Sequence, residues 1–173
     1  AMAVIRNAWT PIILAGNGAI RTRASKQLRI FSEMTRIPVI STYMGKGCVS
    51  RHAEECVFTI GMQPRSLANA AIEASDVVIT VGYDLVEFLP RLWNKWNDKK
   101  IVHIDFLPAV VDQNYQLEAE VIGDLAHTLW MMNERIRSNP QQWDHKVARA
   151  VRQKMLELFE EYKDDHTEGI VKP

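Results

Sequence analysis

The sequence Asp76-Val77-Val78-Ile79-Thr80-Val81-Gly82 decides the fold. It is a short apolar run that ends at a glycine, and continuous runs of this length are typical of strands that are buried on both faces. A second run, Pro11-Ile12-Ile13-Leu14-Ala15, leads in the same way into Gly16-Asn17-Gly18. We therefore expect both segments to be buried strands of a parallel sheet.

Further short strands and amphipathic helices alternate along the chain around these two runs. The expected strands cover residues 39–41, 57–60, 100–105 and 120–123, and the expected helices cover residues 19–36, 65–74 and 125–137. Asp124 directly precedes the last of these helices and can cap it. The alternation predicts an α/β fold, a Rossmann-like doubly wound parallel sheet of about five or six strands with helices on both faces.

The chain after residue 138 has a different pattern. Asn139-Pro140 is a typical helix start, because proline suits the first helical position. An apolar stripe at helical spacing follows, formed by Trp143, Val147, Val151, Met155, Leu158 and Tyr162. We expect one long C-terminal linker helix over residues 140–168. The chain then divides into a Rossmann-like domain at residues 1–138 and a linker segment at residues 139–173.

Composition and charge argue against several classes of protein. Apolar residues make up 47% of the 173 residues, which suits a globular domain with a core of its own. The 21 basic and 21 acidic residues balance, so nothing indicates a nucleic-acid partner. No apolar run reaches the roughly 18 residues of a membrane span. We expect a cytoplasmic protein without a membrane partner.

The two cysteines, Cys48 and Cys56, are expected to be free thiols, since disulfides are rare in a reducing cytosol. His52 alone beside them does not make a metal site. We expect no metal-binding and no catalytic residue in the chain, because no nucleophile triad or paired-carboxylate motif is recognisable. Trp93 and Trp96 are interpreted as part of an apolar patch for a partner.

Candidate cofactor-binding residues follow the expected strands, since ligands of parallel sheets bind at the carboxyl ends of the strands. They are small or acidic, and comprise Gly16, Gly18, Gly82, Asp105, Gly123 and Asp124. The Asp105 carboxylate can accept hydrogen bonds from a ribose diol, or it can cap a short helix that follows it. His103 is expected to be a satisfied interior histidine.

A nicotinamide site is disfavoured by the same residues. Gly16-Asn17-Gly18 is half of the dinucleotide fingerprint, but Arg21 stands in place of the third glycine. Ser41-Thr42 ends the second strand, where the fingerprint requires an acid. A plain strand-to-helix turn accounts for the same glycines. The residues alone predict a nucleotide-capable α/β domain without visible catalytic machinery.

Several segments in order resemble the central domain of the thiamine diphosphate decarboxylase and synthase superfamily. They cover residues 11–18, 38–47, 74–82, 102–105 and 123–124. Residues 82–90, followed by Trp93-Asn94, resemble acetolactate synthases of the catabolic type. Flavin-containing synthases carry an Arg-Phe-Asp-Asp-Arg type of segment there. This chain lacks that segment, so the resemblance argues against FAD while a nucleotide-shaped cleft remains.

The resemblance implies a parent enzyme of three domains. Thiamine diphosphate and Mg²⁺ would bind in the other two, and two pyruvates would condense to 2-acetolactate and CO₂, in branched-chain amino acid or acetoin metabolism. The implied partners are those two domains, a 2-keto acid substrate and further copies in a homodimer or homotetramer. Loops at Gly45, Met62 and Gly82 would approach the active-site mouth. The fragment alone is expected to be inactive.

Two alternatives remain open. The chain can be the FAD- or ADP-binding central domain of a relative, such as a biosynthetic acetolactate synthase, a pyruvate oxidase or an acyl-CoA lyase. It can also be an independent nucleotide-binding regulatory module. Tight binding of FAD or ADP would favour the first alternative.

Overall fold

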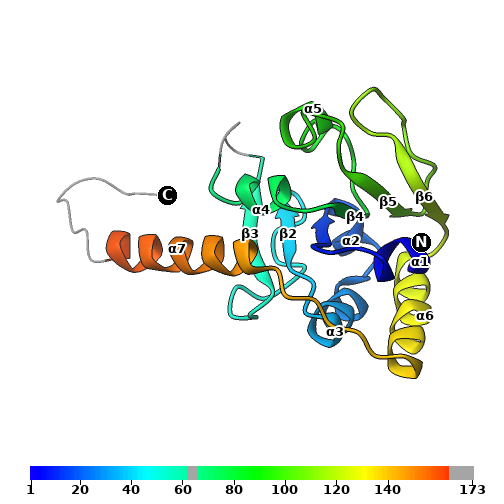
Figure 1. Cartoon of the computed structure of the whole chain (residues 1–173), viewed down its shortest axis with the longest axis horizontal. Coiled ribbons are helices and arrows are strands. Elements are labelled where there is room, and N and C mark those ends of the chain that lie inside the picture. The colour runs from blue at the N-terminus through cyan, green and yellow to red at the C-terminus, as the bar shows by residue number, and fades with distance from the viewer. Residues whose placement is uncertain (62–65, 164–173) are drawn as a thin grey trace.

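The computed structural model describes residues 1–61 and 66–163, and its centre is a six-stranded sheet in which every neighbouring pair is parallel (Figure 1). The strands are β1 (Ile12–Ala15), β2 (Val39–Thr42), β3 (Cys56–Ile60), β4 (Val77–Val81), β5 (Lys100–Asp105) and β6 (Leu117–Ile122). Their order across the sheet is β3-β2-β1-β4-β5-β6. The direction of winding reverses between β1 and β4, as in doubly wound folds. The predicted fold class is confirmed.

The two sequence runs that decide the fold form the middle of this sheet. Every residue of β1 and β4 is buried, and their pairing runs in register from Ile12 beside Val78 to Ala15 beside Val81. Strands covered on both faces need apolar side chains at every position, which explains the unbroken runs. Polar termini such as Asp76 lie outside the strand and bind the neighbouring loop through the amides of Trp9 and Thr10.

Helices cover both faces of the sheet, and each face has its own apolar core. The helices are α1 (Met2–Arg6), α2 (Asn17–Arg21), α3 (Ser25–Thr35), α4 (Asn69–Glu73), α5 (Pro90–Trp93), α6 (Leu125–Ser138) and α7 (Lys146–Lys163). The core on one face includes Leu28 of α3 and Leu129 of α6. The core on the other face includes Ile72 of α4 and Val151 of α7. No helix among the described residues is long and apolar enough to cross a membrane.

The helix predicted over residues 19–36 is in fact two helices. A turn at residues 22–24 separates α2 from α3, and Arg23 in this turn has a φ of 58°. The hydroxyl of Thr22 donates to the carbonyl of Gly18 at 2.8 Å, which helps to end α2. The apolar stripe continues across the turn, so the spacing of side chains did not reveal the break. The helix predicted over residues 65–74 is also shorter within the described residues, since α4 covers Asn69–Glu73, and residue 65 lies outside them.

The prediction that the last helix starts at Pro140 is wrong, because α7 begins at Lys146. Residues 139–145 instead use their polar groups to tie the chain to other segments. The Trp143 amide donates to the Thr35 carbonyl at 2.9 Å, and its indole nitrogen donates to the Ala8 carbonyl at 3.0 Å. Arg6 donates to the carbonyl of Asn139 at 2.8 Å. Residues 164–168 of the predicted helix lie outside the described residues.

Helix α7 packs on α4 and β3 and then extends past the β3 edge of the sheet (Figure 1). An irregularity in β3 contributes to this contact, since Phe58 lies in the β2–β3 register shift and has a φ of 64°. The ring of Phe58 meets Phe159 edge to face, with 5.0 Å between the centroids. Arg152 of α7 lies over the same ring and donates to the Cys56 carbonyl at 2.9 Å.

Three smaller predictions have mixed outcomes. Cys48 and Cys56 are free thiols, as expected, and the structure shows that both are buried. The apolar patch around Trp93 is corrected, because Trp93 is 3% exposed and belongs to the core, whereas Trp96 is 77% exposed. The loop at Met62 lies outside the described residues.

Candidate functional site

A pocket of about 190 Å³ lies at the carboxyl ends of β1, β4 and β5, where the winding of the sheet reverses. Its lining includes Asn17, Gly18, Gly82, Glu87, His103 and Asp105. In open α/β sheets this switch point is the usual place for a ligand. Three of the predicted site residues, Gly18, Gly82 and Asp105, therefore meet at one pocket, which we call the switch-point pocket.

The glycines around this pocket are needed for the packing of two turns against each other. A Cβ on Gly16 would stand 2.4 Å from the Gly82 carbonyl oxygen, and a Cβ on Gly18 would stand 2.6 Å from the Gly82 Cα. Gly82 has a φ of 58°, and its own Cβ would stand 2.4 Å from the Ala19 nitrogen. The backbone after β1 and the backbone after β4 thus touch directly, which only residues without a side chain allow.

The acidic candidates lie apart from one another. Asp105 ends β5, is buried, and accepts the amides of Phe106 and Leu107 at 2.6 and 3.3 Å. Because no helix follows it, Asp105 caps a turn rather than the short helix considered from the sequence. Asp124 caps α6 through the His127 amide at 2.7 Å, as predicted, and is not among the lining residues. Gly123 is joined to Asp105 by a backbone hydrogen bond of 2.9 Å.

Glu87 is the residue at this site that sequence reasoning missed. Its half-buried carboxylate accepts the Asn17 amide on both oxygens, at 2.9 and 3.2 Å, and accepts the hydroxyl of Thr42. It lies against the turn after β1, since a Cβ on Gly16 would be 3.0 Å from its Oε1. Glu87 therefore connects the carboxyl ends of β1 and β2 with the loop after β4. Nothing in the spacing of a loop residue could show that its side chain points back to the sheet.

The floor of the pocket is a buried group of polar side chains. The Tyr115 hydroxyl lies 2.7 Å from the Thr80 hydroxyl and 2.8 Å from Nδ1 of His103. Nε2 of His103 lies 3.3 Å from the Leu107 carbonyl, so both ring nitrogens have partners and the predicted interior histidine is confirmed. Burial raises the pKa of Tyr115 above its ordinary value. These contacts hold the loop of residues 106–116 on the sheet.

The charges around the pocket are mainly negative. Asp84, Glu87 and Asp105 line it, and Arg21 is the basic residue in its lining. Among the described residues there is no cluster of three His, Cys, Asp or Glu side chains that could hold a metal ion. The arrangement can orient loops and bind neutral polar groups.

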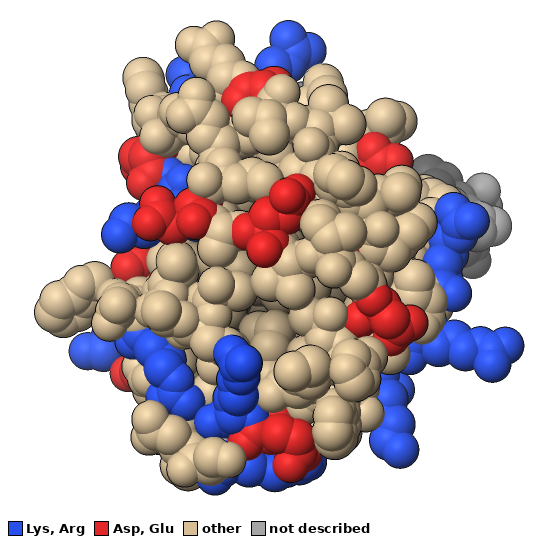
Figure 2. Space-filling model, turned by 90° about the vertical axis from the view of Figure 1, so that its right-hand side faces the viewer, with Lys and Arg blue, Asp and Glu red and all other residues tan. Residues whose placement is uncertain are grey.

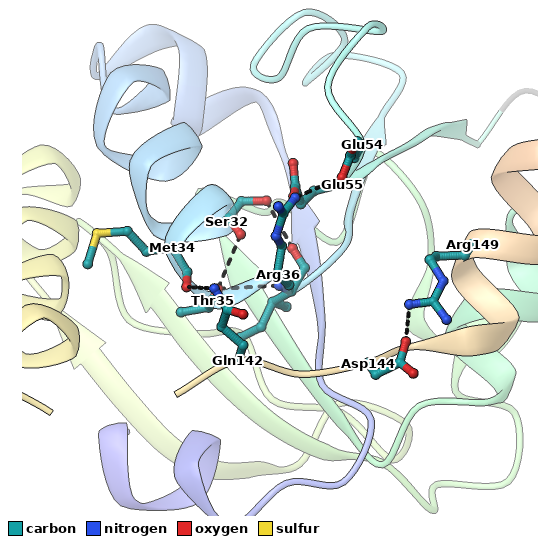
Figure 3. A network of polar contacts seen from close by, with 10 residues as sticks. Ser32, Met34, Thr35, Arg36, Glu54, Glu55, Gln142, Asp144 and Arg149 are labelled. Carbon is teal, nitrogen blue, oxygen red and sulfur yellow. Dashed lines mark hydrogen bonds and ion pairs between the residues drawn. The ribbon is translucent and has the colours of Figure 1, made fainter. Parts of the chain in front are cut away.

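A second pocket, of about 400 Å³, lies beside the amino ends of β2 and β3 and is lined by charged residues that already have partners (Figure 3). Arg36 ends α3 in a left-handed conformation and binds Glu54 at 2.9 Å and Glu55 at 2.6 Å. Asp144 forms an ion pair with Arg149 at the start of α7. The side-chain amide of Gln142 donates to the Met34 carbonyl at 3.4 Å and links α3 to the segment before α7, while the Asp144–Arg149 pair lies apart from the Arg36 pairs.

The side of the molecule formed by α6 and β6 carries scattered acidic and basic groups among uncharged side chains (Figure 2). Large apolar side chains are exposed on these elements, at Ile122, Trp130 and Met131. Val110 and Val111, in the loop beside the switch-point pocket, are 70% and 60% exposed. Surfaces of this kind are typical of contacts with other protein segments.

Comparisons with known proteins point to one family. A family model described as "Thiamine pyrophosphate enzyme, central domain" matches residues 1–132. An acetolactate synthase of Bacillus subtilis is 31% identical over 159 residues, which are 91% of this chain and 28% of that protein. A probable acetolactate synthase large subunit of Methanococcus aeolicus is 34% identical over 128 residues, with 72% of this chain and 21% of that protein covered. The acetolactate synthase large subunit of Haemophilus influenzae is 27% identical over 184 aligned residues and covers 100% of this chain. The chain spans 28%, 21% and 30% of the length of these three relatives.

Proposed function

The chain belongs to the central-domain family of thiamine pyrophosphate enzymes, and from this membership we propose that it is the flavin-free middle domain of a catabolic acetolactate synthase. The observation that carries the proposal is the switch-point pocket. The carboxylate of Glu87 lies against the turn after β1, where a bound nucleotide would place its phosphates. The pocket of about 190 Å³ is also smaller than the roughly 300–1,000 Å³ that ligand sites usually have.

The described residues do not fit thiamine diphosphate, and the acidic lining of the switch-point pocket disfavours FAD. A diphosphate would meet the carboxylates that line the pocket, and the described residues offer no carboxylate or histidine cluster for Mg²⁺. We therefore assign no chemical step to this chain. In the proposed parent, thiamine diphosphate and Mg²⁺ would bind in other domains, and the whole enzyme would convert two pyruvates to 2-acetolactate and CO₂ in the cytoplasm.

The role of this domain in the parent is to position its neighbours. Residues 1–138 form the Rossmann-like unit, and residues 139–173 form the linker segment, of which α7 extends past the β3 edge. The loops at Gly45 and Gly82 are placed by the contacts of Thr42 and Glu87 and face the active-site mouth. The proposed partners are the two other domains and the further copies of a homodimer or homotetramer. The fragment alone is inactive.

One alternative has support from the structure. The strand order is that of dinucleotide-binding domains, and Gly16-Asn17-Gly18 follows β1 directly. Asp105 ends β5 beside the pocket, where its carboxylate can accept hydrogen bonds from the hydroxyls of a ribose. These observations favour an FAD- or ADP-binding central domain as the second candidate, and Gly16, Gly18, Gly82, Asp105, Gly123 and Asp124 remain its proposed ligands.

The decisive experiment uses the full-length parent enzyme. Acetolactate formation from pyruvate is followed with thiamine diphosphate and Mg²⁺, with and without added FAD, and the absorbance of the purified protein is recorded in the flavin bands. We expect a colourless enzyme whose rate does not change with FAD. A yellow enzyme that needs FAD would support the second candidate. Absence of turnover with pyruvate and other 2-keto acids would overturn the synthase assignment.

A further inference from the structure

We propose that the Glu87 carboxylate binds the turn after β1 in place of a phosphate, and so keeps nucleotide diphosphates out of the switch-point pocket. This inference deepens the proposed function and rests on it, because it explains how a domain with a dinucleotide-binding strand order works without a nucleotide. It gives Glu87 the role of a residue that determines specificity.

The first argument is the geometry of the carboxylate. Glu87 lies in the loop after β4, yet its oxygens reach across the strand ends to the Asn17 amide and the Thr42 hydroxyl. The amide of Asn17 directly follows β1, in the turn that carries Gly16 and Gly18. A phosphate oxygen bound by this turn would need the same amide, so Glu87 and a phosphate compete for one donor.

The second argument is the close contact between Glu87 and glycine. The absence of a side chain at Gly16 lets Oε1 of Glu87 approach to within 3.0 Å of the position of a Cβ. In dinucleotide-binding turns the same freedom lets the backbone approach a pyrophosphate. In this protein the Glu87 side chain occupies the space beside Gly16. The turn therefore keeps the glycines of a dinucleotide-binding turn but binds a carboxylate of the same chain instead of a pyrophosphate.

The third argument is electrostatic. A diphosphate in this pocket would meet Glu87 together with Asp84 and Asp105, and Arg21 alone would attract it. Like charges at such short range repel one another more strongly near a protein surface than in bulk water, because the effective dielectric constant is lower. Removing the charge of Glu87, which lies nearest to the donor amide, is therefore expected to tighten ADP binding by about tenfold or more.

The test compares three variants of the 173-residue chain by titration with ADP and, separately, with FAD. Glu87→Gln removes the charge but keeps the shape and an acceptor for the Asn17 amide. Glu87→Ala also opens space. Asp84→Asn is the matched control, because it removes a carboxylate from the same loop, one that accepts the Val86 amide and not a group of the turn after β1. Unfolding midpoints are measured for every variant.

We expect no saturation of the wild-type chain at millimolar ADP, a gain of about tenfold or more in Glu87→Gln, and a change below about threefold in Asp84→Asn. Micromolar binding of ADP or FAD by the wild-type chain would overturn the inference. So would a gain in Asp84→Asn that equals the gain in Glu87→Gln. If Glu87→Ala does not fold, Glu87→Gln still decides. The parent's acetolactate formation is measured separately, so a failure of this inference is distinguishable from a failure of the proposed function.

Discussion

At the scale of single residues, Gly82 shows how closely the turns at the switch point are packed. Replacing Gly82 with Ala places a side chain at a φ of 58° and 2.4 Å from a backbone nitrogen that cannot move freely. We expect the free energy of unfolding to fall by about 2 kcal/mol or more, from backbone strain and from the displaced turn. The measurement is equilibrium unfolding in urea.

Gly47 provides the matched control for this prediction. It also has a positive φ, of 95°, but nothing lies within 4 Å of its Cβ position. Gly47→Ala therefore carries the strain without the collision, and we expect a loss of about 1 kcal/mol. Equal losses of unfolding free energy in the two variants would show that the close contact between the turns is not the reason why position 82 requires glycine.

The site residues show what sequence can and cannot predict at this scale. Asp124 was recognised as a helix cap, because a cap depends on neighbours in the sequence, and the structure confirms it. Glu87 was not recognised, because its partners Asn17 and Thr42 are 70 and 45 residues away. The glycines were placed correctly at the strand ends, but their packing against each other depends on the pairing of β1 with β4.

At the scale of elements, the start of α7 depends on an unprotonated histidine. Nδ1 of His145 accepts the Ala148 amide at 3.1 Å, and only the neutral ring can do this. Burial lowers the pKa of His145 below its ordinary value of 6.5, while Asp76 and Asp144 oppose the shift. The folded protein therefore binds this proton less readily than the unfolded chain. The contribution of neutral His145 to the free energy of unfolding is fully present above pH 6.5 and is lost as the pH falls below that value.

The variant His145→Asn tests this prediction, because asparagine can cap the helix but does not titrate. We expect the unfolding free energy of the variant to decline less between pH 7 and pH 5 than that of the wild-type chain, by up to about 1.4 kcal/mol per pH unit. His52, which is exposed, supplies the control variant His52→Asn. Identical pH profiles for His145→Asn and the wild-type chain would refute the role of His145.

The boundaries of the elements were predicted unevenly, for a physical reason. Strands such as β4 and β5 were located within a residue or so, since burial on both faces requires an unbroken apolar run. The break between α2 and α3 and the extended segment 139–145 were missed. The break depends on the local backbone conformation at Arg23 and on the bond from Thr22 to Gly18, and segment 139–145 depends on distant bonds such as that from Trp143 to Thr35. The periodicity of apolar residues reports neither.

At the scale of the whole molecule, buried weak acids limit stability in alkali. Burial raises the pKa of Cys48 from 9.0 to about 12, and it also raises the pKa values of Cys56, Tyr83 and Tyr115. The unfolded chain releases these protons first, so stability is full below pH 9 and falls as the pH rises toward 12. We expect urea unfolding midpoints to fall steadily from pH 8.5 to pH 10.5.

Cys48→Ala reduces this decline, because it removes one of the groups that titrate differently in the two states. A small loss of packing at neutral pH, of about 1 kcal/mol, accompanies the change. The informative quantity is the slope of stability against pH above 9 in the variant and in the wild-type chain. A slope that the substitution leaves unchanged would show that Cys48 does not contribute.

The doubly wound architecture as a whole followed from the alternation of strand and helix patterns, since parallel strands require crossovers. The order of the strands did not follow from it. Whether β4 pairs with β1 or with β3 is decided by contacts between distant segments, such as the turns at Gly18 and Gly82. The pocket arises from that order, which is why its lining could be predicted only in part.

The bonds between the segment around Arg6 to Ala8 and the segment around Asn139 to Trp143 have a topological consequence. The segment that leads into the Rossmann-like unit and the segment that leads out of it therefore lie side by side, and hydrogen bonds join them. A unit closed in this way can be inserted into another protein, or its sequence circularly permuted, without stretching the parts that flank it.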